Sequence, residues 1–177
     1  HTVRPDAPPD AGLPDRTQLS HYRLVERIGA GGMGIVYRAV DTGLDRPVAL
    51  KVIGHVSDPD RRQRFLKEAR AAAAFNHPNI VIVHAIDRDA NEDVDFIVME
   101  YITGRTLGNL IQTSGALPPD QAYRYAIQIA DALEAAHAKG ILHGDLKPSN
   151  IMINDQDLAK LLDFGLARAR NREMGDP

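Results

Sequence analysis

The sequence contains neither cysteine nor tryptophan, and aromatic residues make up only 5% of it. Without cysteine, disulfide frameworks, thiolate zinc sites and cysteine nucleophiles are excluded. No run of about 18 apolar residues occurs, so we expect no membrane segment in this span. Basic residues are not in excess, since 21 Lys and Arg stand against 24 Asp and Glu. The resulting net charge of −3 disfavours a nucleic-acid partner or a protein bound to an acidic membrane surface.

What remains is ordinary globular composition, with 44% hydrophobic and 25% charged residues. A length of 177 residues allows one domain or two small lobes around a single cleft. The chain starts at His1, and no charged-then-apolar leader follows, so we expect a cytoplasmic piece of a longer product.

The first part of the chain changes from a tail to a strand-rich domain. Residues 1–20 hold Pro5, Pro8, Pro9 and Pro14 and predict a disordered, proline-rich tail, with order starting near Tyr22. Residues 21–101 predict a five-stranded sheet plus one helix. The expected strands cover 22–28, 35–40, 47–53, 80–86 and 94–100, and the expected helix covers about 57–75.

The second part, residues 102–177, is helix-rich. We expect a short helix over 106–112, a long helix over 120–139, and short strands at 151–153 and 158–162. The apolar stripe of the long helix consists of Ala122, Ala126, Ile129, Leu133 and Ala136. The pattern predicts an α+β protein in which a strand-rich half is joined to a helix-rich half.

Glycines at positions 29, 31 and 34 are spaced as in loops whose backbone N–H groups approach phosphate oxygens. A glycine-rich hairpin turn explains the same spacing. A dinucleotide-binding turn would open into a helix and be followed about 20 residues later by an acid. Here a strand pattern continues at Ile35, and Lys51 stands near that distance, so the dinucleotide interpretation is excluded.

Lys51 ends the apolar strand that begins at Val48. A lysine at a strand edge often only extends its ammonium to water. Glu68, however, shares the stripe of Phe65 and Ala72 on the following helix, and an inward carboxylate needs a cation. A Lys51–Glu68 pair could hold the ammonium against the phosphates of a nucleotide.

Further polar groups gather in two short loops, residues 143–150 and 163–165. Phosphoryl transfer requires a carboxylate for the attacking hydroxyl, oxygen ligands for Mg²⁺, and a cation near the transferred group. The two loops contain this set.

Five motifs now stand in order along the chain: Gly29-x-Gly31-x-x-Gly34-x-Val36, Val48-Ala49-Leu50-Lys51, Glu68, His143-x-Asp145-Leu146-Lys147-x-x-Asn150, and Asp163-Phe164-Gly165. Together they resemble the signature set of protein kinases. The stretch from Ile28 to Ile53, with His77-Pro78-Asn79-Ile80-Val81, is most similar to bacterial eukaryotic-like serine/threonine protein kinases, and the kinase resemblance covers roughly residues 20–170. The resemblance implies a protein-kinase-like bilobal fold with a complete β-rich N-lobe and a partial helical C-lobe. It also implies ATP and Mg²⁺ as cofactors and a protein Ser/Thr hydroxyl as acceptor.

The resemblance also implies a role for each catalytic residue. Asp145 is the catalytic base, and Lys147 steadies the γ-phosphate. Lys51 contacts the phosphates and is positioned by Glu68. Asn150 and Asp163 bind the metal.

The ATP-binding residues follow in the same way. Met99 guards the back of the adenine pocket, while Glu100 and Ile102 offer backbone groups to adenine. The full implied set is Ile28, Gly29, Ala30, Gly31, Gly32, Met33, Gly34, Val36, Ala49, Lys51, Met99, Glu100, Ile102 and Met152.

Two departures from the kinase pattern keep alternatives open. Gly144 stands where the usual kinase loop has Arg. The resulting His143-Gly144-Asp145 sequence also resembles kinase-like small-molecule phosphotransferases, such as those acting on aminoglycosides. Only twelve residues follow Gly165, without Ser, Thr or Tyr, so we expect truncation within the activation segment and partial exposure of Ile129 and Leu133. A non-catalytic nucleotide-binding or regulatory module is therefore a further alternative, and we expect the fragment alone to be inactive.

Overall fold

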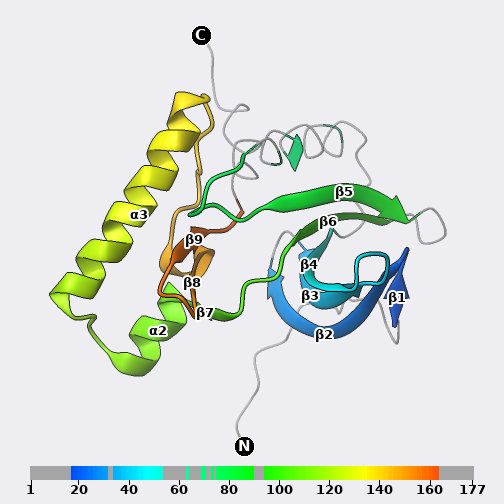
Figure 1. The fold of residues 1–177 in the computed structure, drawn as a ribbon, viewed down its shortest axis with the longest axis horizontal. Coiled ribbons are helices and arrows are strands. Elements are labelled where there is room, and N and C mark those ends of the chain that lie inside the picture. Colours follow the sequence, from blue (N-terminus) through cyan, green and yellow to red (C-terminus); the bar gives the residue numbers. More distant parts are fainter. Residues whose placement is uncertain are drawn as a thin grey trace, which may run out of the picture.

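The computed structural model describes residues 17–31, 34–53, 63, 69–70, 73, 75–89 and 94–163. Its larger sheet, here called the N-terminal sheet, has six strands in the order β1-β2-β3-β4-β6-β5, all antiparallel to their neighbours (Figure 1). The strands are β1 (Gln18–Leu19), β2 (Tyr22–Gly31), β3 (Gly34–Asp41), β4 (Arg46–Ile53), β5 (Val83–Asp89) and β6 (Val94–Glu100).

Side-chain alternation along β4 gives the sheet two different faces. Val48, Leu50 and Val52 join the buried core formed with Phe96 and Val98 of β6. Burying each large aliphatic side chain contributes about 1.5–3 kcal/mol. Because successive residues of a strand point to opposite faces, Ala49 and Lys51 fall on the other face.

The start of the ordered chain lies earlier than the sequence predicts. Residues 1–16 lie outside the described residues, but 17–20 are described, and β1 pairs with β2 through Leu19↔Tyr22. Leu19 is completely buried, which explains why this short strand is held in place. The prediction of a tail through residue 20 is therefore wrong for its last four residues, and the sheet gains a sixth strand.

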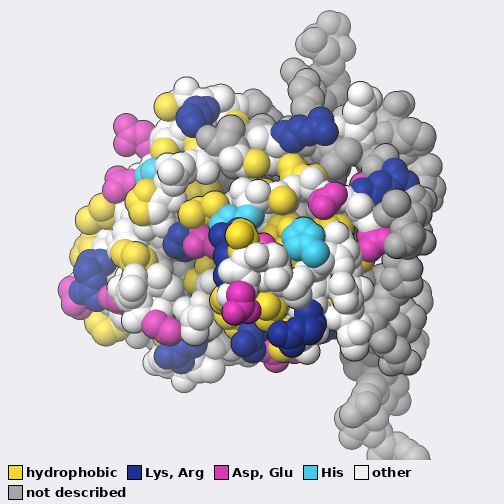
Figure 2. Space-filling model, turned by 45° about the vertical axis from the view of Figure 1, so that its right-hand side comes forward, with side chains coloured by type: hydrophobic (Ala, Val, Ile, Leu, Met, Phe, Trp, Pro, Cys, Tyr) yellow, Lys and Arg dark blue, Asp and Glu magenta, His cyan; other side chains and the backbone are white. Residues whose placement is uncertain are grey.

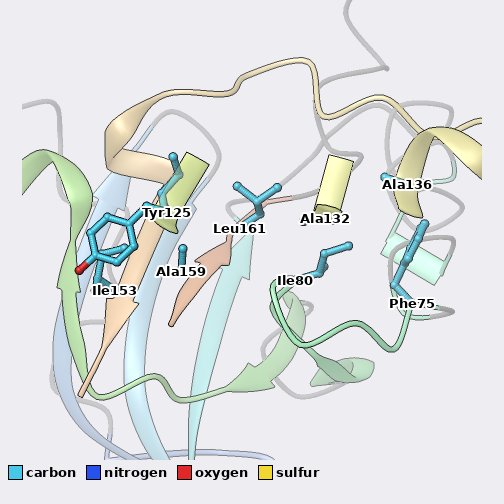
Figure 3. Packing of buried hydrophobic residues seen from close by; sticks show 9 residues of the cluster. Phe75, Ile80, Tyr125, Ala132, Ala136, Ile153, Ala159 and Leu161 are labelled. Carbon is cyan, nitrogen blue, oxygen red and sulfur yellow. The ribbon is translucent and has the colours of Figure 1, made fainter. Parts of the chain in front are cut away.

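The fourth predicted strand is displaced along the chain. Residues 80–86 were expected to form it, whereas β5 begins at Val83. Ile80 makes an isolated parallel bridge to Leu161 instead. Together with Phe75, it packs into a core shared with the C-terminal half (Figure 3). Residues 75–81 thus contribute to the packing of the second half although they precede residue 101.

The C-terminal half is built around a small antiparallel sheet in the order β7-β8-β9. Its elements are β7 (Gly104–Thr106), α2 (Leu107–Ser114), α3 (Pro119–Ala138), the 3₁₀ turn η1 (Pro148–Asn150), β8 (Ile151–Asn154) and β9 (Ala159–Leu161). Thr106 caps α2, since its hydroxyl accepts the N–H of Asn109 at 3.0 Å. A Cβ at Gly104 would lie 2.1 Å from the carbonyl oxygen of Ile153, so only glycine lets β7 approach β8.

Helix α3 buries one face and leaves another open. Tyr125, Ala132 and Ala136 are buried against the small sheet (Figure 3). Ile129 and Leu133 pack against the same cluster. Ile129 and Leu133 are only partly buried, which agrees with the expectation that they are partly exposed. On the open face of α3 the exposure is larger, with Tyr123 71% exposed and Ile127 62% exposed. Of the predicted stripe, Ala122 and Ala126 are exposed.

Basic and acidic side chains are interspersed among hydrophobic ones over the molecular face shown in Figure 2. This mixed surface agrees with the nearly balanced charge of the chain. Within the described ranges, no helix is long and apolar enough to span a bilayer.

Candidate active site

The face of the N-terminal sheet that carries Ala49 and Lys51 collects several of the predicted ATP-binding residues. Gly29 lies opposite Val36, and Val36 opposite Lys51, while Ala49 lies opposite Met99. A Cβ built on Gly29 would meet only the Val36 side chain, at an ordinary 3.7 Å. The protein's own packing therefore does not require glycine there. Gly31 and Gly34 face each other where β2 and β3 meet, and Gly32 and Met33 lie outside the described residues.

Lys51 reaches from this face to Asp163, the last described residue of the C-terminal half. Its Nζ donates to Oδ1 of Asp163 at 2.6 Å. The Lys51 side chain is only 5% exposed, and that of Asp163 is 34% exposed. Asp163 adopts φ 56°, in the left-handed region. Glu68 lies outside the described residues, so the predicted Lys51–Glu68 pair stays a prediction.

Asp145, Lys147 and Asn150 form a second group in the loop before β8. Nζ of Lys147 donates to Asp145 Oδ2 at 2.7 Å, and Nδ2 of Asn150 donates to the same oxygen at 3.1 Å. Nδ2 of Asn150 also donates to the Asp145 carbonyl at 2.8 Å. The hydrogen bond from Lys147 is the main cause that lowers the pKa of Asp145 below its usual value; desolvation opposes it, and the hydrogen bond from Asn150 lowers the pKa further. Asp145 is therefore an ionised acceptor near neutral pH.

His143 joins the two groups. Its ring lies buried, with Nε2 2.9 Å from the Leu162 carbonyl oxygen and Nδ1 accepting the Asp145 N–H at 3.3 Å. This arrangement needs the proton on Nε2. Burial lowers the pKa of His143, although the Leu162 carbonyl and the nearby carboxylates oppose this shift. A neutral imidazole thus ties the Asp145 loop to the residue before Asp163. Gly144, beside it, has φ 76°, a conformation that favours glycine.

The chain between the two halves, residues 101–103, starts directly after β6. The N–H of Glu100 donates to the Ile82 carbonyl at 2.9 Å, so it is already engaged within the protein. Of the backbone groups predicted to meet adenine, Glu100 can therefore offer only its carbonyl. Ile102 and Met152 are partly exposed, while Ile28 is 47% exposed.

Two contributors were missed at the level of sequence. His143 is part of a predicted motif but was given no role, and its signal is a histidine preceded by Ile141 and Leu142 and followed by Gly144. Lys160 was given no role, since a single charged residue in a short strand carries no distinguishing signal. Its Nζ donates to Glu100 Oε1 at 2.7 Å, and the two side chains are 12% and 21% exposed.

The donor chemistry fits magnesium rather than a softer metal. Asn150 and Asp163 supply oxygen atoms, and the carboxylate of Asp145 lies beside Asn150. Mg²⁺ characteristically takes one or two carboxylates and completes its shell with substrate phosphates and water. Among the described residues, no group of three or more His, Cys, Asp and Glu could hold a metal by itself. A nucleotide-dependent magnesium site does not need such a group.

Comparisons with known proteins agree with this geometry. Residues 22–175 match the family model described as "Protein kinase domain". The chain is 46% identical over 158 residues to a Clostridium acetobutylicum protein named "Probable serine/threonine-protein kinase", covering 88% of this chain and 24% of that protein. It is 42% identical over 152 residues to the serine/threonine-protein kinase PknB of Mycobacterium leprae, covering 84% and 24% respectively.

The fold has solved counterparts as well. The structure titled "PpkA-294 apo form" superposes with a TM-score of 0.77 at 30% identity, covering 89% of this chain and 63% of that one. The chain thus spans about a quarter of the length of the two curated relatives. Since the family model covers most of the sequence, the chain belongs to the protein kinase domain family.

Proposed function

We propose that this chain carries the ATP-binding and catalytic groups of a serine/threonine-protein kinase. The observation that supports this most is the meeting of Lys51 with Asp163 at 2.6 Å, beside the Asp145 group. The buried ammonium of Lys51 can bind phosphate oxygens of a nucleotide, and the neighbouring carboxylate of Asp163 can bind the magnesium ion that accompanies them. The proposal divides the chain into an N-lobe of residues 17–101, which includes β1, and a partial C-lobe of residues 102–177.

In the proposed reaction, Asp145 orients a Ser or Thr hydroxyl of a protein substrate and accepts its proton at a carboxylate oxygen. Its lowered pKa keeps this oxygen ionised at neutral pH. Asn150 fixes the carboxylate from one side, while the Lys147 ammonium offsets negative charge on the transferred group. His143 holds the loop against Leu162, so that Asp145 and Asp163 keep their relative positions.

Asn150 and Asp163 would hold Mg²⁺, which supplies charge neutralisation at the phosphates when bound. Lys51 would turn its ammonium toward the same phosphates, and the backbone of residues 29–34 would cover them. Gly29 supports this role, because a Cβ there would meet only the Val36 side chain at an ordinary distance. Internal packing therefore does not require this glycine, whereas close approach of the backbone to a ligand would. The apolar walls would come from Ile28, Val36, Ala49 and Met152, with Met99 behind the adenine.

The names of the matched relatives favour a protein kinase over a small-molecule phosphotransferase or a non-catalytic module. The retained groups at Lys51, Asp145, Asn150 and Asp163 also speak for catalysis, since each has a distinct task in phosphoryl transfer. A cytoplasmic location, where ATP is available, is part of the proposal.

The proposal is tested by phosphate transfer from labelled ATP in the complete gene product. Asp145→Asn should leave ATP affinity within about twofold and cut turnover, because a base acts in the transition state rather than in ground-state binding. Ser149→Ala serves as the control, since Ser149 is exposed in the same loop and has no assigned role. Undiminished transfer to protein Ser or Thr in Asp145→Asn would refute the assignment. Transfer to an aminoglycoside but to no protein would favour the small-molecule alternative.

A further inference from the structure

Two ion pairs join the N-terminal sheet to β9 and the residues that follow it. One is Lys51–Asp163, and the other is Glu100–Lys160, whose Nζ and Oε1 lie 2.7 Å apart. The cation belongs to the sheet in the first pair and to β9 in the second. Because Lys160 precedes Asp163 by three residues, both pairs act on one short stretch of chain.

Glu100 is held firmly on the side of the sheet. Its Oε1 accepts the N–H of Ile82 at 2.8 Å, and its own N–H donates to the Ile82 carbonyl at 2.9 Å. Lys160 therefore meets a carboxylate that is already oriented, so little side-chain entropy is lost in forming the pair. At 12% and 21% exposure, the two side chains are also poorly screened by water.

Strand β9 is held along its other edge by residues 79–81. The N–H of Val81 donates to the Leu161 carbonyl at 2.9 Å, and the N–H of Leu161 donates to the Asn79 carbonyl at 2.8 Å. Nδ2 of the buried Asn79 donates to the Ala159 carbonyl at 2.8 Å. Figure 3 shows Ile80 beside Leu161 in the same packed layer. Hydrogen bonds from residues 79–81 thus fix Ala159 and Leu161, and the Lys160 side chain adds the direct link to the end of β6.

We infer that Lys160 is a positioning residue for the proposed nucleotide site. By holding β9 to Glu100, it keeps the chain leading into Asp163 at the spacing at which Asp163 meets Lys51. The adenine end of the site depends on the backbone of Glu100 and Ile102, and β6 holds the Glu100 backbone through its pairing with Val48, whereas the phosphate and magnesium end needs Lys51 and Asp163 together. Loss of the Lys160 cation should therefore weaken binding of the triphosphate much more than binding of adenosine. This inference rests on the proposed function for its binding readout.

The test measures Mg²⁺-ATP and adenosine affinity by calorimetry on the 177-residue chain. Lys160→Met should weaken Mg²⁺-ATP binding about tenfold, since a lower fraction of binding-competent chain raises the apparent Kd in proportion. Adenosine affinity should change by less than about threefold under the same relation. Lys160→Arg should restore Mg²⁺-ATP affinity, because it returns the cation to the same carboxylate. Arg124→Met is the matched control, since Arg124 pairs with Asp120 and Asp157 within the C-terminal half and should leave both affinities unchanged.

An unchanged Mg²⁺-ATP affinity in Lys160→Met, an equal loss for both ligands, or failure of Lys160→Arg to restore binding would each overturn the inference. A purely structural role would lower thermal stability without changing the ratio of the two affinities. Hydrogen exchange without nucleotide separates this inference from the proposed function. The Ile82 amide should exchange faster in Lys160→Met, because its acceptor Glu100 is loosened. If wild-type chain binds no Mg²⁺-ATP, the proposed function fails; unchanged Ile82 exchange overturns the positioning role in either case.

Discussion

Lys51 and Asp163 are 112 residues apart in the sequence, yet Nζ and Oδ1 lie 2.6 Å apart across the two halves of the molecule. The ammonium is almost fully buried, whereas the carboxylate keeps about a third of its side-chain exposure. The two members of the pair therefore depend on each other unequally. The lysine has little access to water if it loses its partner, while the aspartate can be solvated.

This inequality predicts different stabilities for two substitutions. Asp163→Ala leaves a buried charged donor behind and should lower the free energy of unfolding by about 1–3 kcal/mol. Lys51→Met removes the charge, keeps an apolar stem of similar length and should cost less, since a buried charge is destabilising mainly when its partner is missing. Urea unfolding of both variants checks the order. A greater loss for Lys51→Met than for Asp163→Ala would contradict the described pair.

His143 predicts a pH dependence of stability. Burial lowers its pKa below the ordinary value of 6.5, so the unfolded chain takes up a proton before the folded one as the pH falls. The contribution of neutral His143 to the free energy of unfolding is fully present above pH 6.5. Below that pH it is lost progressively, at up to about 1.36 kcal/mol per pH unit. His84 also has a pKa lowered by desolvation, so His84→Asn is measured beside it.

The measurement is the free energy of unfolding in urea between pH 5 and pH 8. His143→Gln should flatten the slope below pH 6.5 relative to the parent chain, because the titrating group is removed. His84→Asn should keep the contribution of His143. An unaltered slope in His143→Gln would show that this buried imidazole does not set the pH dependence.

The open face of α3 predicts self-association. Tyr123 and Ile127, one helical turn apart, are 71% and 62% exposed. Exposed apolar patches on soluble proteins promote association. Tyr123→Lys combined with Ile127→Lys should therefore reduce concentration-dependent association in sedimentation velocity, while the melting temperature changes by no more than a few degrees. As a matched control, Leu44→Lys changes an exposed leucine on the distant β3–β4 turn and should leave association as it was. Equal association of all three proteins would refute a role for this face.

The longer strands were predictable from the sequence, because alternation of apolar and polar residues shows which face of a strand is buried. Two residues show no periodicity, so β1 could not be found from Gln18 and Leu19. Ile80 and Val81 were misassigned to a strand of the larger sheet because burial alone does not reveal the partner. They pack along β9 instead, through contacts that span about half the chain.

The candidate site shows the same division between local and distant information. The Asp145 group was predictable because Lys147 and Asn150 lie within five residues of it. Lys51 and Asp163 were each predicted to have a role, but the sequence did not predict that they form an ion pair with each other. The Glu100–Lys160 pair was missed altogether, since a single charged residue in a short strand is typical of a solvated face. Only the packing of β9 against residues 79–81 brings its ammonium to Glu100.

The most direct test of the account is calorimetric titration of the chain with ATP, in magnesium and again in EDTA, for the parent sequence and Asp163→Asn. The account predicts that magnesium strengthens ATP binding to the parent chain and that Asp163→Asn removes most of this gain while binding adenosine nearly as well. An equal magnesium effect in both proteins, or no binding of ATP to the parent chain, would contradict it.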